Sequence, residues 1–369
     1  MIGTIERAHA RIDLGAVAHN VRRVVEAAGT SRVMAVVKAD AYGHGAVACA
    51  RTATQAGATS LGVHTVAEAE QLRAHGLAVP VLVMGPLIGP EWGRSAAAGV
   101  EVVAWTPEGV RAAAEAGVGG VHLELDSGMG RLGARPEALG DLVRAATGAA
   151  VPVVGIMSHF ATADDRDGEQ AGFFREQLVR FRSAATGLRA TFPEARIHAA
   201  NSAATFRDAD ARFDMVRCGI ALYGCSPFHE DPSVLGLRPV MSVVSYLAMV
   251  KTIRSRDSVG YGRTWRAERG TQIGLVPVGY GDGYARALGN NAEVLVNGRR
   301  VPVIGAVSMD QLTVELGPEG TESVGAPVVL LGAQGDQRIT TEELAERRRT
   351  INYEITCGVG QRLPRVYVG

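Results

Sequence analysis

The sequence predicts an α/β protein of two domains, a (β/α)8 barrel followed by a smaller, mostly antiparallel β domain. Over the first two-thirds of the chain, eight short apolar runs alternate with helical stretches rich in alanine and charged residues. After Leu237, long helical stretches are scarce and short β-type runs follow one another. A length of 369 residues agrees with this division, because a typical domain has about 150 residues.

The eight apolar runs do not alternate with polar residues, as expected for parallel strands that are buried on both faces. They cover residues 33–37, 60–64, 80–84, 100–104, 120–125, 152–158, 196–200 and 214–217. Helices are predicted at 16–28, 46–56, 66–75, 91–98, 107–116, 136–146, 169–190 and 202–208, two of them with proline in the first turn. Eight strand–helix repeats favour a closed barrel over an open sheet, and we assign residues 12–236 to it.

Residues 237–369, with 1–11 as an added strand, form the predicted β domain. Its β-type runs cover 243–253, 272–278, 293–296, 300–304, 312–316 and 327–331. Asn297 and Gly298 between two of these runs predict a tight hairpin. The basic run 347–349 is interpreted as a solvated helix end rather than a binding patch.

Composition and charge exclude several classes of protein. Lys and Arg number 38, and Asp and Glu also 38, so the chain has no net charge to attract nucleic acid or an anionic membrane. The longest apolar stretches fall far short of the ~20 residues that span a bilayer, and residues 1–13 lack a signal-peptide core. The four cysteines form no CxxC pair, so we expect free thiols in the cytoplasm and no metal site: Cys49, Cys218, Cys225 and Cys357.

Residues 128–133 match the GxGxxG pattern of dinucleotide-binding loops. The match follows the fifth predicted strand rather than the first, and Pro136 restarts the chain before a helix can open within the glycines. The acidic residue expected about 20 positions later is also missing. We therefore do not interpret this segment as a nucleotide site.

The carboxyl ends of the predicted barrel strands carry the candidate catalytic residues, since barrel enzymes place their active sites there. Lys38 follows the first strand. A lysine that leaves an apolar strand is partly desolvated, which makes it a nucleophilic amine suited to a Schiff base with an aldehyde. The alternative is a surface lysine whose stem packs against the protein and whose ammonium stays in water.

Further polar residues and a glycine-containing turn stand at the carboxyl ends of the later strands. They are Glu124, Asp126 and Arg131 at the fifth, Ser158 and His159 at the sixth, Asn201 and Ser202 at the seventh, and Arg217, Gly219 and Ile220 at the eighth. Barrels often bind phosphate after strands seven and eight. A lysine, a phosphate site, a histidine and an arginine at one barrel mouth fit pyridoxal phosphate better than other common cofactors. Taken singly, Ser202 could be only a helix cap and His159 only a core residue.

Longer motifs extend over essentially the whole chain: VVKADAYGHG around Lys38, DSGMGRLG at 126–133, MSHFATAD at 157–164, NSAA at 201–204, MVRCGIALYG at 215–224, VGYGRTW at 259–265, VGYGDGY at 278–284, SMDQ at 308–311 and INYE at 351–354. In these motifs the chain resembles the alanine racemase family. The resemblance implies a pyridoxal-phosphate-dependent isomerase that interconverts L- and D-alanine. It also implies D-alanine supply as a peptidoglycan precursor and a cytoplasmic, head-to-tail homodimer with shared active sites.

The resemblance implies roles for single residues. Lys38 holds the cofactor and is the base on the D-substrate side, while Tyr261, from the β domain of the partner subunit, is the base on the L side. Cofactor-binding positions are matched by Tyr42, His159, Asn201, Ser202, Arg217, Gly219, Ile220 and Tyr353, substrate-binding ones by Arg131 and Met309, and supporting ones by Glu124 and Tyr280. An arginine such as Arg217 at the pyridine nitrogen leaves that nitrogen unprotonated, which shortens the life of a carbanion and disfavours transamination.

Three positions depart from the family pattern. Glu124 stands where many members have a lysine that becomes a carbamate, and we expect Glu124 to hold Arg131 without any modification. Ser308 replaces a common cysteine, with little effect expected. Ala306 replaces an arginine near the active-site entrance, so we expect some tolerance of substrates larger than alanine. The other entrance positions match the family: Asp164, Arg286 and Ile351.

The sequence leaves three other functions open. One is a related racemase of broader range that accepts amino acids such as serine, although Tyr353 would crowd its pocket. A second is a fold-related decarboxylase of basic amino acids, which Arg217 and Tyr261 oppose because those enzymes place an acidic residue at the pyridine nitrogen. A third is a non-catalytic pyridoxal-phosphate-binding protein, a class that has the barrel alone and lacks a β domain.

Overall fold

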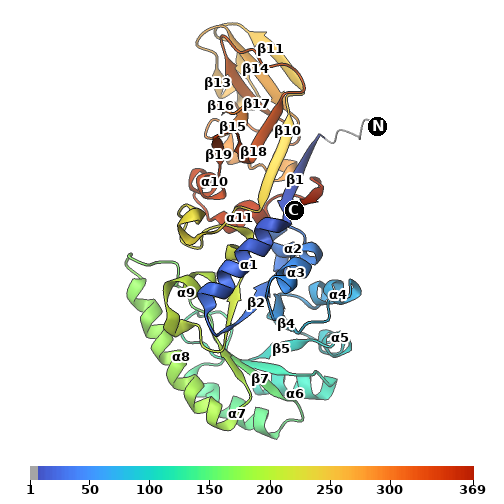
Figure 1. The fold of residues 1–369 in the computed structure, drawn as a ribbon, viewed down its shortest axis with the longest axis vertical. Coiled ribbons are helices and arrows are strands. Elements are labelled where there is room, and N and C mark those ends of the chain that lie inside the picture. The colour runs from blue at the N-terminus through green and yellow to red at the C-terminus, as the bar shows by residue number, and fades with distance from the viewer. Residues whose placement is uncertain (1–6) are drawn as a thin grey trace. The chain divides into compact units, whose positions relative to one another are not determined.

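The computed structural model describes residues 7–369, which divide into two compact units (Figure 1). The barrel unit comprises Val17–Phe228 and Ser233–Leu237. The β unit comprises Met1–Ala16, His229–Pro232 and Arg238–Gly369. Each unit has its own sheet and its own hydrophobic cluster.

Eight parallel strands form the barrel unit, in the order β8-β7-β6-β5-β4-β3-β2-β9. They are β2 (Arg32–Val36), β3 (Ser60–Val63), β4 (Val81–Val83), β5 (Glu101–Ala104), β6 (Val121–Glu124), β7 (Val153–Met157), β8 (Arg196–His198) and β9 (Met215–Cys218). The two ends of this order are joined by backbone bonds from Asp214 N to Ile197 O at 3.0 Å and from Arg217 N to Ala200 O at 2.8 Å. The barrel is therefore nearly closed, which confirms the predicted fold class.

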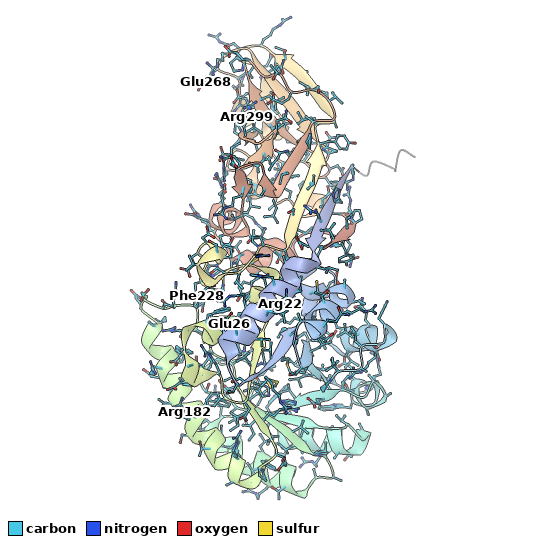
Figure 2. The ribbon with its side chains drawn as sticks, viewed as in Figure 1. Arg22, Glu26, Arg182, Phe228, Glu268 and Arg299 are labelled. Atoms are coloured by element: carbon cyan, nitrogen blue, oxygen red, sulfur yellow. The ribbon has the colours of Figure 1, made fainter. Side chains whose placement is uncertain are left out.

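Helices cover the outside of the barrel (Figure 1). They are α1 (Leu14–Ala28), α3 (Ala46–Gln55), α4 (Val66–Ala74), α5 (Glu91–Ala97), α6 (Pro107–Ala116), α7 (Leu139–Gly148), α8 (Ala171–Thr191) and α9 (Ser202–Arg207). Their outer faces are charged, as with the exposed Arg22 and Glu26 on α1 and Arg182 on α8 (Figure 2). All eight predicted helices are found, and the one predicted at 136–146 begins with a short 3-10 turn, η1 (Pro136–Ala138). Within residues 7–369, no helix combines the length and the apolar character that crossing a membrane requires.

The barrel strands enclose both apolar and polar side chains. An apolar cluster is formed by Met34, Leu82, Val103, Met157 and Met215. His122, His198 and Arg217 are also buried on these strands. A Cβ on Gly155 of β7 would overlap the His122 ring, so the glycine makes room for an imidazole inside the barrel. The buried polar groups require internal hydrogen-bond partners, because water does not reach them.

Residues 128–133 form a loop, as predicted, and not the start of a helix. Asp126 Oδ1 accepts hydrogen bonds from Gly128 N and Gly130 N, both at 3.0 Å. A Cβ on Gly133 would lie 2.7 Å from the carbonyl carbon of Leu125, so the glycine allows two backbone segments to approach closely.

The β unit contains one large sheet, in the order β11-β14-β17-β16-β15-β18-β10-β1-β20, with β19 paired to β18. Its strands are β1 (Ala8–Asp13), β10 (Met241–Tyr246), β11 (Met249–Ile253), β14 (Thr271–Val276), β15 (Glu293–Val296), β16 (Arg299–Ile304), β17 (Leu312–Gly317), β18 (Pro327–Gln334), β19 (Gln337–Ile339) and β20 (Arg365–Val368). Neighbouring strands are antiparallel except β1 and β20. A separate hairpin joins β12 (Ser258–Val259) to β13 (Trp265–Arg266).

Two predictions for this unit require correction or restriction. The single run predicted at 243–253 is two strands, because β10 pairs with β18 whereas β11 pairs with β14. The strand predicted within residues 1–11 is β1, which pairs with β10, and residues 1–6 lie outside the described residues.

Two short helices, α10 (Thr341–Arg348) and α11 (Asn352–Cys357), complete the β unit. The basic run 347–349 ends α10, but two of its arginines are not simply solvated. Arg347 donates to Asn291 O at 2.8 Å and pairs with Glu343 at 3.0 Å. Arg348 pairs with Glu354 at 2.9 Å, and its side chain is mostly buried. These arginines therefore hold α10 against its neighbours.

Candidate active site

Lys38 stands directly after β2, at the carboxyl end of the first barrel strand, and it is half-buried. It opens the turn α2 (Lys38–Gly43), in which residues 39–42 adopt left-handed helical backbone with φ of 52 to 55° and ψ of 39 to 49°. None of these residues is glycine. Each L-residue in this conformation costs about 1–2 kcal/mol, so the turn persists only because neighbouring groups hold it.

Tyr42, Ser202 and Gly219 follow three different strands and meet at one point. Ser202 Oγ accepts hydrogen bonds from Gly219 N at 3.1 Å and from Ala221 N at 3.4 Å. A Cβ on Gly219 would overlap the Tyr42 hydroxyl, so glycine is required there. Two hydroxyl groups and two backbone N–H groups thus form a cradle of the kind that binds phosphate.

The residues beside the cradle connect it to the strands. Asn201 is the N-cap of α9, and its side-chain oxygen accepts a hydrogen bond from Ala204 N at 3.0 Å. Ile220 is buried and begins the short helix η3 (Ile220–Tyr223). The Tyr223 hydroxyl donates to Val36 O at 2.9 Å, so the segment after β9 is tied to the end of β2.

Arg217 is almost fully buried at the centre of the site, with 4% of its surface exposed. Nη1 donates to His198 Nδ1 at 2.8 Å and to His198 O at 3.1 Å. Nη2 donates to Ser158 O at 2.8 Å and to His159 Nδ1 at 3.1 Å. Burial lowers the pKa of Arg217 to about 10, which still leaves it a cation at neutral pH. These four acceptors are neutral groups rather than carboxylates.

The hydrogen bonds of Arg217 determine the tautomers of a buried histidine chain. A guanidinium only donates, so His198 Nδ1 must accept and His198 Nε2 carries the proton. His198 Nε2 then donates to His122 Nδ1 at 2.8 Å, and His122 Nε2 donates to Glu101 Oε2 at 2.9 Å. Glu101 also pairs with Arg196, with 3.3 Å between Oε1 and Nη2. We call this series, from Arg217 to Glu101, the histidine chain.

The pKa values in the histidine chain agree with these tautomers. Burial, together with the positive charge of Arg217, lowers the pKa of His198 well below its usual value. Burial also lowers the pKa of His122, even though Glu101 acts to raise it. Burial would raise the pKa of Glu101, but His122 and Arg196 outweigh it and the pKa lies below its usual value. Neutral histidines and an ionised carboxylate are thus the favoured states.

His159 is half-buried beside Arg217 and accepts through Nδ1. Burial lowers the pKa of His159 well below its usual value, and the charges of Arg217, Arg131 and Lys38 act in the same direction. His159 is therefore a neutral ring that lies within electrostatic reach of three cations. This is the environment in which an uncharged imidazole can lie against a planar cofactor.

Glu124 ends β6 and is buried, and among the described residues no hydrogen-bond partner is found for its Oε2. Burial raises the pKa of Glu124, while Arg217 and Arg131 act to lower it. Arg131 is exposed. Glu124 and Arg131 are thus within electrostatic reach of one another, and the direct pairing expected from the sequence stays a prediction.

In the β unit, Tyr261, Tyr280 and Met309 lie on three loops that contact one another. The glycine before Tyr261 lies against Ala306, and Tyr280 N donates to Ser308 O at 3.0 Å. The exposed fractions are 71% for Tyr261, 42% for Tyr280 and 52% for Met309. Large side chains exposed to this degree are available for contact with another molecule. Tyr353 lies on α11 and is half-buried.

The predicted site residues therefore fall into two sets. The barrel unit contains Lys38, Tyr42, Glu124, Arg131, His159, Asn201, Ser202, Arg217, Gly219 and Ile220, and the β unit contains Tyr261, Tyr280, Met309 and Tyr353. Sequence reasoning missed His122, His198 and Glu101. The available signal was a histidine within an apolar strand run, since a polar group buried on both faces must have a partner.

The site combines a lysine at a strand end, an anion cradle and a buried arginine. Among (β/α)8 barrels, this combination defines the class of enzymes that bind a phosphorylated aldehyde through a lysine. Comparison with known proteins narrows this class. The family model "Alanine racemase, N-terminal domain" matches residues 12–227, and "Alanine racemase, C-terminal domain" matches residues 240–367. The chain belongs to the alanine racemase family, whose members are pyridoxal-phosphate-dependent isomerases.

Individual relatives agree over almost their whole length. The chain is 40% identical to an alanine racemase from Cutibacterium acnes, with 98% of each chain covered. The crystal structure of alanine racemase from Streptomyces lavendulae matches with a TM-score of 0.93 and 39% identity, covering 99% of this chain and 98% of that one. The alanine racemase from Bartonella henselae, solved with covalently bound pyridoxal phosphate, matches with a TM-score of 0.87 and 28% identity, covering 98% and 100%.

We predict that Glu124→Gln lowers kcat/KM by about 10-fold or more, which corresponds to roughly 1.4 kcal/mol. The variant removes the buried carboxyl group that interacts electrostatically with Arg131 and Arg217. Steady-state kinetics in both reaction directions measure the effect. Glu137→Gln is the matched control, because Glu137 is an exposed carboxylate in the connection after the same strand. Normal KM and kcat in Glu124→Gln would show that Glu124 merely ends a strand.

We predict that the barrel loses stability as the pH falls below about 6.5, the ordinary pKa of histidine. The folded-state pKa values of His122, His159 and His198 are lowered, so the unfolded chain binds more protons in this range and folding is disfavoured. Each histidine contributes up to about 1.4 kcal/mol per pH unit. Urea titrations at pH 7.5, 6.5 and 5.5 measure the slope.

The comparison protein for this measurement is His198→Gln, which has one fewer titrating ring. Its slope between pH 6.5 and 5.5 should be smaller than that of the unchanged protein. Glu124, whose raised pKa contributes with the opposite sign, is common to both proteins and cancels. Equal slopes for the His198→Gln variant and the unchanged protein would contradict the prediction.

Proposed function

We propose that this protein interconverts L-alanine and D-alanine with pyridoxal phosphate as its cofactor. The observation that carries the proposal is the position of Lys38, which leaves the first barrel strand half-buried at the barrel mouth. Sequence similarity also supports the proposal, because the chain matches alanine racemases over nearly its whole length.

The residues of the barrel unit fit this cofactor. The cradle at Gly219, which a Cβ would fill, suits its phosphate, with Tyr42, Ser202, Gly219 and Ile220 as the proposed ligands and Tyr353 as a further one. Lys38 would hold the aldehyde carbon, His159 would lie against the ring, and Asn201 lines the same pocket. When bound, pyridoxal phosphate withdraws electrons from an attached amino acid and makes its Cα–H acidic.

Racemisation requires proton transfer on both faces of Cα. We assign Lys38 Nζ to the D side and the Tyr261 hydroxyl to the L side, so that one removes a proton and the other returns one. Tyr261 lies in the β unit and is largely exposed, which makes its hydroxyl available to another chain. We therefore propose a homodimer with shared sites, in which residues 12–236 bind the cofactor and residues 237–369, with 1–11, lend the second base.

Arg217 is assigned to the pyridine nitrogen of the cofactor. A guanidinium with a pKa of about 10 holds its own protons at neutral pH and accepts none, so it leaves that nitrogen unprotonated. Arg217 would thereby weaken electron withdrawal by the ring, which would favour return of the proton to Cα over transamination. This residue also opposes a decarboxylase of the related fold, where an acidic residue would stand.

We assign the substrate carboxylate to Arg131 and Met309, with Glu124 and Tyr280 as supporting residues. A racemase of broader range is the second candidate, favoured by one observation. Ala306 lies against the residue before Tyr261 and presents only a methyl group. Larger amino acids, serine among them, would then enter more easily than in members with an arginine at this place.

The proposed cellular setting is the cytoplasm, with D-alanine supplied as a peptidoglycan precursor. Cys49, Cys218, Cys225 and Cys357 form no disulfide within the described residues, which suits a reducing compartment.

The experiment that tests the function is incubation of the pure protein with pyridoxal phosphate and single L-amino acids, followed by chiral chromatography. We expect D-alanine from L-alanine, a smaller yield of D-serine from L-serine, and no amine product from lysine. Lys38→Ala is the control and should form no D-alanine. Failure of the unchanged protein to racemise alanine would overturn the proposal.

We predict that two inactive variants complement one another. Lys38→Ala and Tyr261→Phe each lose one base, so each is at least about 100-fold less active alone, as expected for loss of a general acid–base group. After subunit exchange, a mixed dimer has one site with both bases intact and regains part of the activity. Exchange is verified with differently tagged chains. Proven exchange without recovered activity would contradict shared sites.

A further inference from the structure

The left-handed turn after Lys38 is held from outside by the first turn of α4. Glu68 Oε1 accepts a hydrogen bond from Ala39 N at 2.7 Å. Glu68 Oε2 accepts from His64 N at 2.8 Å and from Thr65 N at 3.0 Å. One carboxylate therefore connects the segment after β2 to the segment after β3 through three backbone N–H groups.

The bond to Ala39 N acts directly on Lys38. The N–H of Ala39 belongs to the peptide group that the carbonyl of Lys38 forms, so fixing this N–H fixes the ψ angle of Lys38. The backbone then enters a left-handed turn that non-glycine residues adopt only when they are held. Two of the four residues in the turn, Ala39 and Asp40, are exposed, so burial does not hold them there.

The rest of the turn has its own supports. Asp40 Oδ1 accepts from Ala46 N at 2.7 Å, at the start of α3. Asp40 O accepts from Gly45 N at 2.8 Å, and Ala41 N donates to Val37 O at 2.9 Å. Beneath the turn, the His44 ring stacks on the Tyr223 ring with 4.6 Å between centroids. Of these hydrogen bonds, the one that Glu68 accepts is made by the peptide between Lys38 and Ala39.

We propose that Glu68 is a positioning residue, which holds the Lys38–Ala39 peptide and thereby sets the direction in which Lys38 and Tyr42 leave the turn. The proposal rests on the function proposed above for the roles of those two side chains. The simpler role for Glu68 is helix capping, since Thr65 and Glu68 form a capping box at the start of α4. The bond to Ala39 is not part of that box.

A rescue experiment separates the two roles. Glu68→Ala removes both, whereas Thr65→Val removes the side-chain cap and leaves Glu68 in place. Ala39→Gly relieves the backbone cost at the residue that Glu68 holds, because glycine adopts positive φ readily. Glu70→Ala is the matched control on the same helix, where Glu70 only pairs with Arg94.

The measured quantities are kcat, the Kd of the cofactor-free protein for pyridoxal phosphate by absorbance titration, the Tm, and amide hydrogen exchange of residues 38–43. We expect Glu68→Ala to lower kcat and raise the Kd, each by about 10-fold, a change of roughly 1.4 kcal/mol. Exchange at residues 38–43 should accelerate. The double variant Glu68→Ala with Ala39→Gly should recover most of kcat and of the Kd. Thr65→Val should lower the Tm alone, and Glu68→Gln should give an intermediate Kd.

Three outcomes would overturn the proposal: unchanged Kd and exchange in Glu68→Ala, equal effects of Glu68→Ala and Thr65→Val on kcat and Tm, or no recovery with Ala39→Gly. Hydrogen exchange is read on the cofactor-free protein and does not depend on the reaction. A chain without racemase activity would therefore overturn the proposed function while the exchange data still decide whether Glu68 holds the turn.

Discussion

The burial of a positive charge at Arg217 is the constraint around which the barrel interior is organised. A guanidinium removed from water must find acceptors for its N–H groups, or its burial is prohibitively costly. Its hydrogen-bond acceptors here are carbonyl oxygens and two imidazoles, and the histidine chain that begins at Arg217 ends at the carboxylate of Glu101. Within the described residues no carboxylate accepts a hydrogen bond from this guanidinium, and the buried Glu124 acts on it only through space.

The two walls of the site are held by different physical means. On the side of β8 and β9, regular secondary structure positions the residues: a helix cap places Ser202, and a short 3-10 turn places Gly219. On the side of β2, the backbone is in an unfavourable conformation and side chains from other elements hold it there. In the proposed function, the first wall recognises the phosphate of the cofactor and the second wall presents Lys38.

Much of the barrel is readable from the sequence, because buried parallel strands are apolar runs and the residues after them share one rim. Lys38, Ser202 and Arg217 could be placed at that rim for this reason. The turn after Lys38 could not, since the sign of φ leaves no trace in the pattern of alanine, aspartate and tyrosine. The contact of His122 with His198 also escaped prediction, because it depends on the stagger of strands that are not neighbours in sequence. In the β unit, the parallel pairing of β1 with β20 joins the two ends of the chain, and no local pattern encodes it.

The site can be completed only after β9, the last barrel strand to be synthesised, has paired with β8. The backbone bonds between these strands close the barrel, and the residues directly beyond them supply Asn201, Ser202, Gly219 and the neighbouring N–H groups. Lys38 and Tyr42 are therefore synthesised long before Ser202, Gly219 and the N–H groups that complete the cradle. A growing chain on the ribosome has a lysine but no pocket until the last barrel strand has emerged and closed the ring. A complete cradle for the phosphate of the cofactor is thus formed only after β9 has joined the barrel sheet.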